Sequence, residues 1–185
     1  MAIEWRCTLC GECCKRYVPL VLPEDIERIK ESLKRPMSAF VTFYRPNDFE
    51  HVVDDSDERF FRTKHGKLAM GLTQVDLPGN DVGCIFLKDN LCSIHTFKPF
   101  VCGQYPFLPL DPDNVDGPFR LVDNPCFGKH ATDETVDEHP VRRRYRVFQE
   151  KQEGYNQKVQ EWNEDPKSEE KEIEDFLAYL GLEWT

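Results

Sequence analysis

Cys7-Thr-Leu-Cys10-Gly-Glu-Cys13-Cys14 is the stretch of sequence that decides the fold. Two successive C-x2-C spacings allow three thiolates to reach one metal centre, because the chain curls around it with its amides facing the sulfurs. Three ligands at this pitch match the first three of a bacterial-ferredoxin-type run, whose remaining ligand comes from further along the chain. Zinc sites more often take one close pair from each of two places. The spacing therefore favours a 4Fe-4S cluster and leaves zinc as the alternative.

The other cysteines extend this candidate site. Cys14 directly follows Cys13, and adjacent side chains tend to point apart, so Cys14 is either a ligand of a second centre or a wall residue of the first. One grouping gives Cys7, Cys10, Cys13 and one distant cysteine to one centre and Cys14 with the other three to a second; the alternative is one centre with four bystander cysteines. All eight cysteines are candidate metal ligands, namely Cys7, Cys10, Cys13, Cys14, Cys84, Cys92, Cys102 and Cys126.

Composition excludes several classes of protein. The net charge of −10 over 185 residues works against nucleic acid binding, which depends on neutralising phosphates. No stretch approaches the roughly 18 consecutive apolar residues of a membrane span. The sequence shows no secretory leader before Cys7, so we expect a cytoplasmic protein with reduced cysteines rather than a disulfide scaffold. The basic run at residues 142–146 is expected to be a solvated helix face.

Hydrophobic patterning predicts an α+β fold. Helices are expected at residues 24–34, 141–163 and 168–180, from apolar positions spaced three and four apart and from flanking prolines. A short helix is expected at 38–45 and a loop at 105–118. Hairpins are expected at 59–70, around a His65-Gly66 turn, and at 84–94, around Asp89-Asn90. The second hairpin would bring Cys84 and Cys92 close together.

The predicted organisation is an irregular cysteine-rich core with short hairpins, followed by a helical extension. We expect a metal-binding domain at residues 1–130. Residues 131–185 would form C-terminal helices that pack on this domain or contact a partner.

A second motif carries a resemblance to a known family. It reads Cys92-Ser-Ile-His95-Thr-Phe-Lys98-Pro99-Phe-Val-Cys102-Gly-Gln-Tyr105-Pro106. Together with Cys7 to Cys14 and Cys84-Ile-Phe-Leu, it resembles the YkgJ-type CxxCxxCC family of zinc- or iron-chelating proteins. The resemblance implies metal chelation by the cysteines at 7, 10, 13, 14, 84, 92 and 102. Cys126 lies outside the matching motifs.

Lys98 and His95 stand inside this motif. Lys98 occupies the place where the family usually has arginine, and we expect it to lie beside the metal centre and to offset its charge. The family allows tyrosine in place of His95, which favours a packing role over metal ligation for this imidazole.

Three functions are consistent with these residues. The first is an iron–sulfur protein, with one or two 4Fe-4S clusters, in electron transfer, redox sensing or maturation, working with a protein partner. The second is a zinc-structured adaptor. The third is a subunit of a protein-modifying methylase, which the resemblance suggests through the flagellin lysine N-methylase, a relative reported to carry an iron–sulfur cluster. No glycine-rich loop that would hold S-adenosylmethionine is identifiable, so we expect no catalytic activity of the chain alone.

Overall fold

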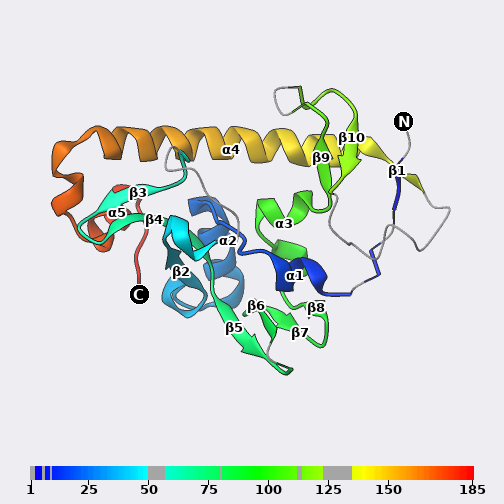
Figure 1. The fold of residues 1–185 in the computed structure, drawn as a ribbon, viewed down its shortest axis with the longest axis horizontal. Helices are drawn as coiled ribbons and strands as arrows, with labels where there is room; N and C mark the ends of the chain where they lie inside the picture. The colour runs from blue at the N-terminus through cyan, green and yellow to red at the C-terminus, as the bar shows by residue number, and fades with distance from the viewer. Residues whose placement is uncertain are drawn as a thin grey trace. The chain divides into compact units, whose positions relative to one another are not determined.

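The computed structural model describes residues 3–5, 7–8, 10–49, 57–79, 81–111, 114–122 and 135–185. The fold is α+β, as predicted: short antiparallel sheets accompany a long C-terminal helix, α4 (Glu138–Glu164) (Figure 1). Two compact units form. The cysteine unit comprises Met1–Tyr17 and Val75–Glu150, and the apolar unit comprises Val18–Gln74 and Lys151–Thr185. Both include part of α4, and the predicted domain boundary at residue 130 stays a prediction.

The apolar unit contains a three-stranded antiparallel sheet in the order β2-β4-β3. The predicted hairpin at 59–70 is confirmed by β3 (Phe61–Thr63) and β4 (Gly66–Leu72). The predicted helix at 38–45 is wrong. Met37–Ala39 forms one 3-10 turn, η1, and β2 (Val41–Tyr44) then pairs with β4. The run Val41-Thr-Phe-Tyr is β-branched and aromatic, and these side chains suit a half-buried strand better than a helix.

Helix α2 (Pro23–Leu33) confirms the helix predicted at 24–34. Proline stands at its first position, where the missing N–H costs no hydrogen bond. The buried carboxylate of Asp25 accepts a hydrogen bond from the Leu22 amide at 3.2 Å and pairs with Arg28 at 2.5 Å. The start of the helix is therefore fixed by its own first turn.

The second half of α4 and helix α5 (Ile173–Tyr179) close the core of the apolar unit. The rings of Phe61 and Phe176 stack with centroids 3.8 Å apart, and Trp162 meets Phe176 edge-on at 5.1 Å. The helix predicted at 168–180 is confirmed in part, since η5 (Pro166–Glu170) is a 3-10 helix and the α-helix begins at Ile173.

The outer edge of β3 is covered by side chains of α4. Asn163 accepts a hydrogen bond from the Arg62 amide at 2.8 Å and donates to the Phe60 carbonyl at 2.9 Å. The Trp162 indole donates to the Arg62 carbonyl at 2.7 Å. An edge strand otherwise presents unpaired backbone groups, and α4 satisfies them here.

The cysteine unit is built from small antiparallel strand pairs. These are β1 (Ile3–Glu4) with β11 (Thr135–Val136), β5 (Gln74–Leu77) with β6 (Asp81–Cys84), β7 (Leu87–Lys88) with β8 (Leu91–Cys92), and β9 (Phe107–Pro109) with β10 (Phe119–Leu121). Pairing of β7 with β8 confirms the second predicted hairpin. The predicted loop at 105–118 is wrong in part, because β9 lies within it. Its Phe107 is buried with Phe119 and Val141, and this burial outweighs the nearby prolines.

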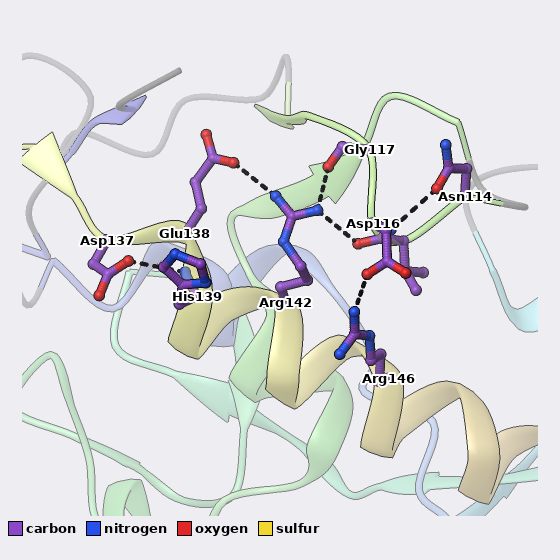
Figure 2. Close-up of polar contacts among 9 residues, drawn as sticks. Asn114, Asp116, Gly117, Asp137, Glu138, His139, Arg142 and Arg146 are labelled. Atoms are coloured by element: carbon purple, nitrogen blue, oxygen red, sulfur yellow. Dashed lines mark hydrogen bonds and ion pairs between the residues drawn. The ribbon is translucent and has the colours of Figure 1, made fainter.

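The first half of α4 is fastened to the turn at residues 114–117 (Figure 2). Arg142 donates to the carbonyls of Val115 and Gly117, at 3.2 and 2.8 Å, and pairs with Glu138. Arg146 pairs with Asp116. These two arginines therefore have structural partners, whereas Arg143 and Arg144 are exposed, as expected of a solvated face.

The helix predicted at 141–163 is confirmed by α4, along which Val141, Tyr155, Val159 and Trp162 are buried. Among the helices that the structure describes, none combines the length and the apolar character needed to cross a membrane.

Candidate metal centre

Cys13 and Cys14 lie on the short helix α1 (Glu12–Arg16), which begins after Gly11. Gly11 has a φ of 75°, and a Cβ at this position would lie 3.1 Å from Leu87 Cδ1 and 3.2 Å from Asn90 Cα. Only glycine tolerates both the left-handed backbone and this approach. The glycine inside the cysteine motif thus lets α1 start against the turn between β7 and β8.

A second glycine brings α1 against β6. A Cβ at Gly83 would lie 2.7 Å from Leu77 Cδ1 and 3.3 Å from the carbonyl oxygen of Cys14. Helix α1 packs on β6, and β6 ends at the buried Cys84. The close approach therefore sets Cys14 beside the strand that carries Cys84.

Cys84 and Cys92 occupy two similar turns. The amide of Phe86 donates to the Cys84 sulfur, and the amide of Ile94 donates to the Cys92 sulfur. In each turn the donor is a buried apolar residue two positions after the cysteine. Hydrogen bonds from amides stabilise thiolate over thiol and orient metal-ligating sulfurs.

Phe86 also joins the two turns to each other. Its carbonyl accepts hydrogen bonds from the Ser93 amide at 2.9 Å and from the Ser93 hydroxyl at 3.0 Å. The turn that holds Cys84 is thus tied to the residue that follows Cys92.

Cys102 lies on helix α3 (Phe100–Gln104). The ring of Tyr105, just after α3, packs against that of Tyr17, just after α1, with centroids 5.7 Å apart. The Gln104 amide group donates to the Arg144 carbonyl at 3.2 Å. These contacts hold α3 between α1 and the start of α4.

The side chain of Cys14 forms hydrogen bonds with those of Cys13 and Cys92. Its hydrogen bond lowers the pKa of Cys13 to about 7 and that of Cys92 to about 6. The same bonds raise the pKa of Cys14 itself. A donor next to a sulfur favours the charged form of that sulfur, so Cys13 and Cys92 have thiolate character near neutral pH.

The thiols of Cys84 and Cys102 are more deeply buried than those of Cys13 and Cys92. Burial raises the pKa of Cys84 to about 11, and burial also raises the pKa of Cys102, with the neighbouring sulfurs adding to it. Both would have to lose a proton to ligate a metal, as thiol ligands generally do.

Lys98 supplies the positive charge of this site. It lowers the pKa values of Cys13, Cys92 and Cys102. Its ammonium group lies 3.4 Å from Nε2 of His95, whose pKa is lowered by the same charge. His95 contacts Lys98 from an exposed position, and the role of Lys98 at a metal centre stays a prediction.

Three more cysteines were predicted as metal ligands. Cys7 is exposed and Cys10 half-buried in the loop before α1, and Cys126 lies outside the described residues. None of the cysteines that the structure describes forms a disulfide. Within the described ranges, no three His, Cys, Asp or Glu side chains already surround a common point as metal ligands do, so a bound metal would have to draw the thiols inward.

The donor set nevertheless fits a thiolate-bound metal. Five thiols from four elements gather with amide donors and one lysine, which is the environment that stabilises clustered thiolates. Sequence reasoning missed the amide donors of Phe86 and Ile94. The repeated pattern of a cysteine followed two residues later by a large apolar residue was the available signal.

Fold and site together define a cysteine-rich chelating protein. The family model CxxCxxCC, described as a putative zinc- or iron-chelating domain, matches residues 6–134. This match covers more than half of the chain, and the chain belongs to that family. No curated protein and no solved structure matches it.

Proposed function

We propose that this protein carries an iron–sulfur cluster of the 4Fe-4S type for electron transfer, redox sensing or maturation, and has no catalytic activity of its own. The observation that carries the proposal is the gathering of Cys13, Cys14, Cys84, Cys92 and Cys102 around the charge of Lys98. A 4Fe-4S cluster takes four cysteine thiolates, and this group offers enough.

The chain's own groups would set the properties of such a cluster. A bound cluster would supply one-electron redox chemistry. The amides of Phe86 and Ile94 donate to two sulfurs, and Lys98 places a positive charge beside them. Hydrogen bonds to the sulfurs, net charge and solvent exposure are the factors that tune the potential of these clusters. The buried rings and methyl groups of Phe86 and Ile94 limit the access of water.

The proposal includes a protein partner and a reducing compartment such as the cytoplasm. Val82 and Leu91 are 49% and 47% exposed on the two strands that end in Cys84 and Cys92. Exposed apolar side chains on the strands that carry these cysteines suit contact with a redox or assembly partner. Free thiols persist in reducing compartments.

A zinc-structured adaptor is the second candidate. Four thiolates in a closed arrangement are also a common structural zinc site. The strong burial of Cys84 favours it, because a structural site needs no exposed coordination position.

Metal analysis of anaerobically purified protein decides between the two. The proposal expects a brown protein with iron and acid-labile sulfide in equal amounts, and an electron paramagnetic resonance signal after reduction with dithionite. A colourless protein that holds stoichiometric zinc and no iron under strict anaerobiosis would establish the zinc adaptor instead.

A further inference from the structure

The first half of α4 presents an exposed face that is rich in arginine. Its four members stand at positions i, i+3, i+4 and i+7 of the helix and therefore lie on one side of it, and they are Pro140, Arg143, Arg144 and Val147. All four are exposed, and the exposed fraction of Val147 is 38%. The opposite side of the same turns carries the buried Val141. We call the four exposed residues the arginine face.

The two arginines of this face differ from their neighbours on α4 in the contacts that they make. Arg142 and Arg146 bind the turn at residues 114–117 (Figure 2). Within the part of the chain that the structure describes, the guanidinium groups of Arg143 and Arg144 form no ion pair and no hydrogen bond. This holds although the chain has 34 acidic and 24 basic residues. Two adjacent guanidinium groups thus stay available for carboxylates of another molecule.

Contacts on the other side of α4 hold the arginine face in place. The backbone carbonyl of Arg144 accepts a hydrogen bond from the Gln104 amide group at 3.2 Å. Val141 packs with Phe107 and Phe119 in the apolar cluster of the cysteine unit. A binding surface on a fixed helix loses mainly side-chain freedom when a partner binds. The arginine face is therefore preorganised for binding.

The charge of the arginine face favours carboxylates as its ligands. A guanidinium group forms bidentate pairs with carboxylates, and Val147 offers an apolar contact one turn after Arg143 and Arg144. Nucleic acid fits poorly, because its binding depends on neutralising many phosphates, and here two arginines would act against a net charge of −10. An anionic membrane attracts clusters of about four to eight basic residues. Two arginines therefore suit a short segment with few carboxylates better than either polyanion.

We propose that the arginine face binds a short acidic segment of a partner protein. Two carboxylates of the segment pair with Arg143 and Arg144, and one of its apolar side chains packs on Val147. This surface goes beyond the proposed function, because it does not require that the thiols bind a metal.

Binding of an acidic peptide tests the arginine face. Full-length protein is purified anaerobically and titrated against a fluorescein-labelled peptide in which pairs of glutamates flank a leucine, and fluorescence anisotropy reports the affinity. The double variant Arg143→Gln/Arg144→Gln should bind the peptide about 10-fold less tightly, because it lacks both ion pairs. Val147→Ser should bind it about 3-fold less tightly, because it lacks the apolar contact.

A second double variant, Arg35→Gln/Lys158→Gln, is the matched control. It removes the same charge from two exposed positions of the apolar unit, and its affinity should stay within about 2-fold of wild type, because salt screens distant charges. Glutamine suits helices as well as arginine does, and circular dichroism verifies that each variant is folded.

Several outcomes would overturn the arginine face as a site for an acidic segment. These are failure of the wild type to bind the peptide, equal losses of affinity in the two double variants, and unchanged affinity in Val147→Ser. Tighter binding of phosphatidylserine vesicles than of the peptide would assign the face to a membrane. Self-association in sedimentation that Arg143→Gln/Arg144→Gln abolishes would assign it to a second copy of the chain. Peptide binding by a wild type that carries no metal would support this proposal and overturn the proposed function.

Discussion

The apolar unit and the cysteine unit are stabilised by different means. Most of the largest fully buried side chains in the described residues belong to the apolar unit, among them Phe40, Phe61 and Phe176. The cysteine unit has a small apolar cluster around Phe107, and its strands are only two to four residues long. Short isolated hairpins are marginal in water. We therefore expect burial to stabilise the apolar unit, and the cysteine unit to depend on the metal of the proposed function.

Removal of the metal is expected to have the largest effect and to fall on one unit. Structural metal centres contribute an apparent binding free energy of about 10 kcal/mol or more. Amide exchange in β6 to α3 should accelerate strongly after chelation, while α2 and β4 remain protected. Hydrogen exchange followed by mass spectrometry measures both regions in one sample. Equal acceleration of amide exchange in the two units would contradict the expectation that only the cysteine unit depends on the metal.

Phe176→Ala should have the next largest effect, in the apolar unit. The ring is fully buried and stacks on Phe61, and loss of a buried phenylalanine ring costs about 3–5 kcal/mol. Urea denaturation followed by circular dichroism measures the loss. Glu174→Ala on the same helix, where the side chain is exposed, serves as the control and should cost under about 1 kcal/mol. Metal per folded chain should not change in either variant.

Arg142→Met tests the contact between α4 and the turn at residues 114–117 of the cysteine unit. The guanidinium satisfies two carbonyls and one carboxylate, and hydrogen bonds to a charged group contribute about 1.5–3 kcal/mol. We expect a loss of this order in the free energy of unfolding. Arg146→Ala removes only an exposed ion pair and should cost under about 1 kcal/mol. Equal losses would show that the turn at 114–117 is not what Arg142 secures.

Tyr155→Phe should have the smallest effect and only at alkaline pH. Burial raises the pKa of Tyr155, so its phenol ionises more readily in the unfolded chain than in the folded one. Stability is therefore undiminished below pH 10 and falls as the pH rises above that value, by up to about 1.4 kcal/mol per pH unit. The variant should show a shallower alkaline decline in thermal melts. Parallel declines in wild type and variant would exclude this contribution.

The sequence predicted the fold where a local pattern and tertiary packing agree. Pro23 and the acidic first turn marked α2, and the four- and three-residue spacing of Tyr155, Val159 and Trp162 marked α4. Residues 38–45 were misassigned, because the pairing of Val41–Tyr44 with β4 is a long-range interaction that no local pattern reveals.

The cysteine motifs were recognisable from the sequence, whereas the packing of the elements that carry them was not. Spacing favoured a centre shared by Cys7, Cys10 and Cys13 and left other groupings open, and all of these groupings stay predictions. The structure sets Cys13 among sulfurs 71 to 89 positions away along the chain. Gly11 and Gly83 make this possible through close backbone approaches, whose effect appears only when the elements are packed.

The division of the chain between the two units has a consequence for inheritance. The chain passes from one unit to the other after Tyr17, after Gln74 and after Glu150, so neither unit is encoded by a contiguous segment of the gene. A single contiguous segment that contains all eight cysteines also contains Val18–Gln74 of the apolar unit. The family match ends at residue 134, before Phe176, the stacking partner of Phe61. A chain truncated after residue 134 would keep every cysteine of the matched region and would lose one ring of this pair.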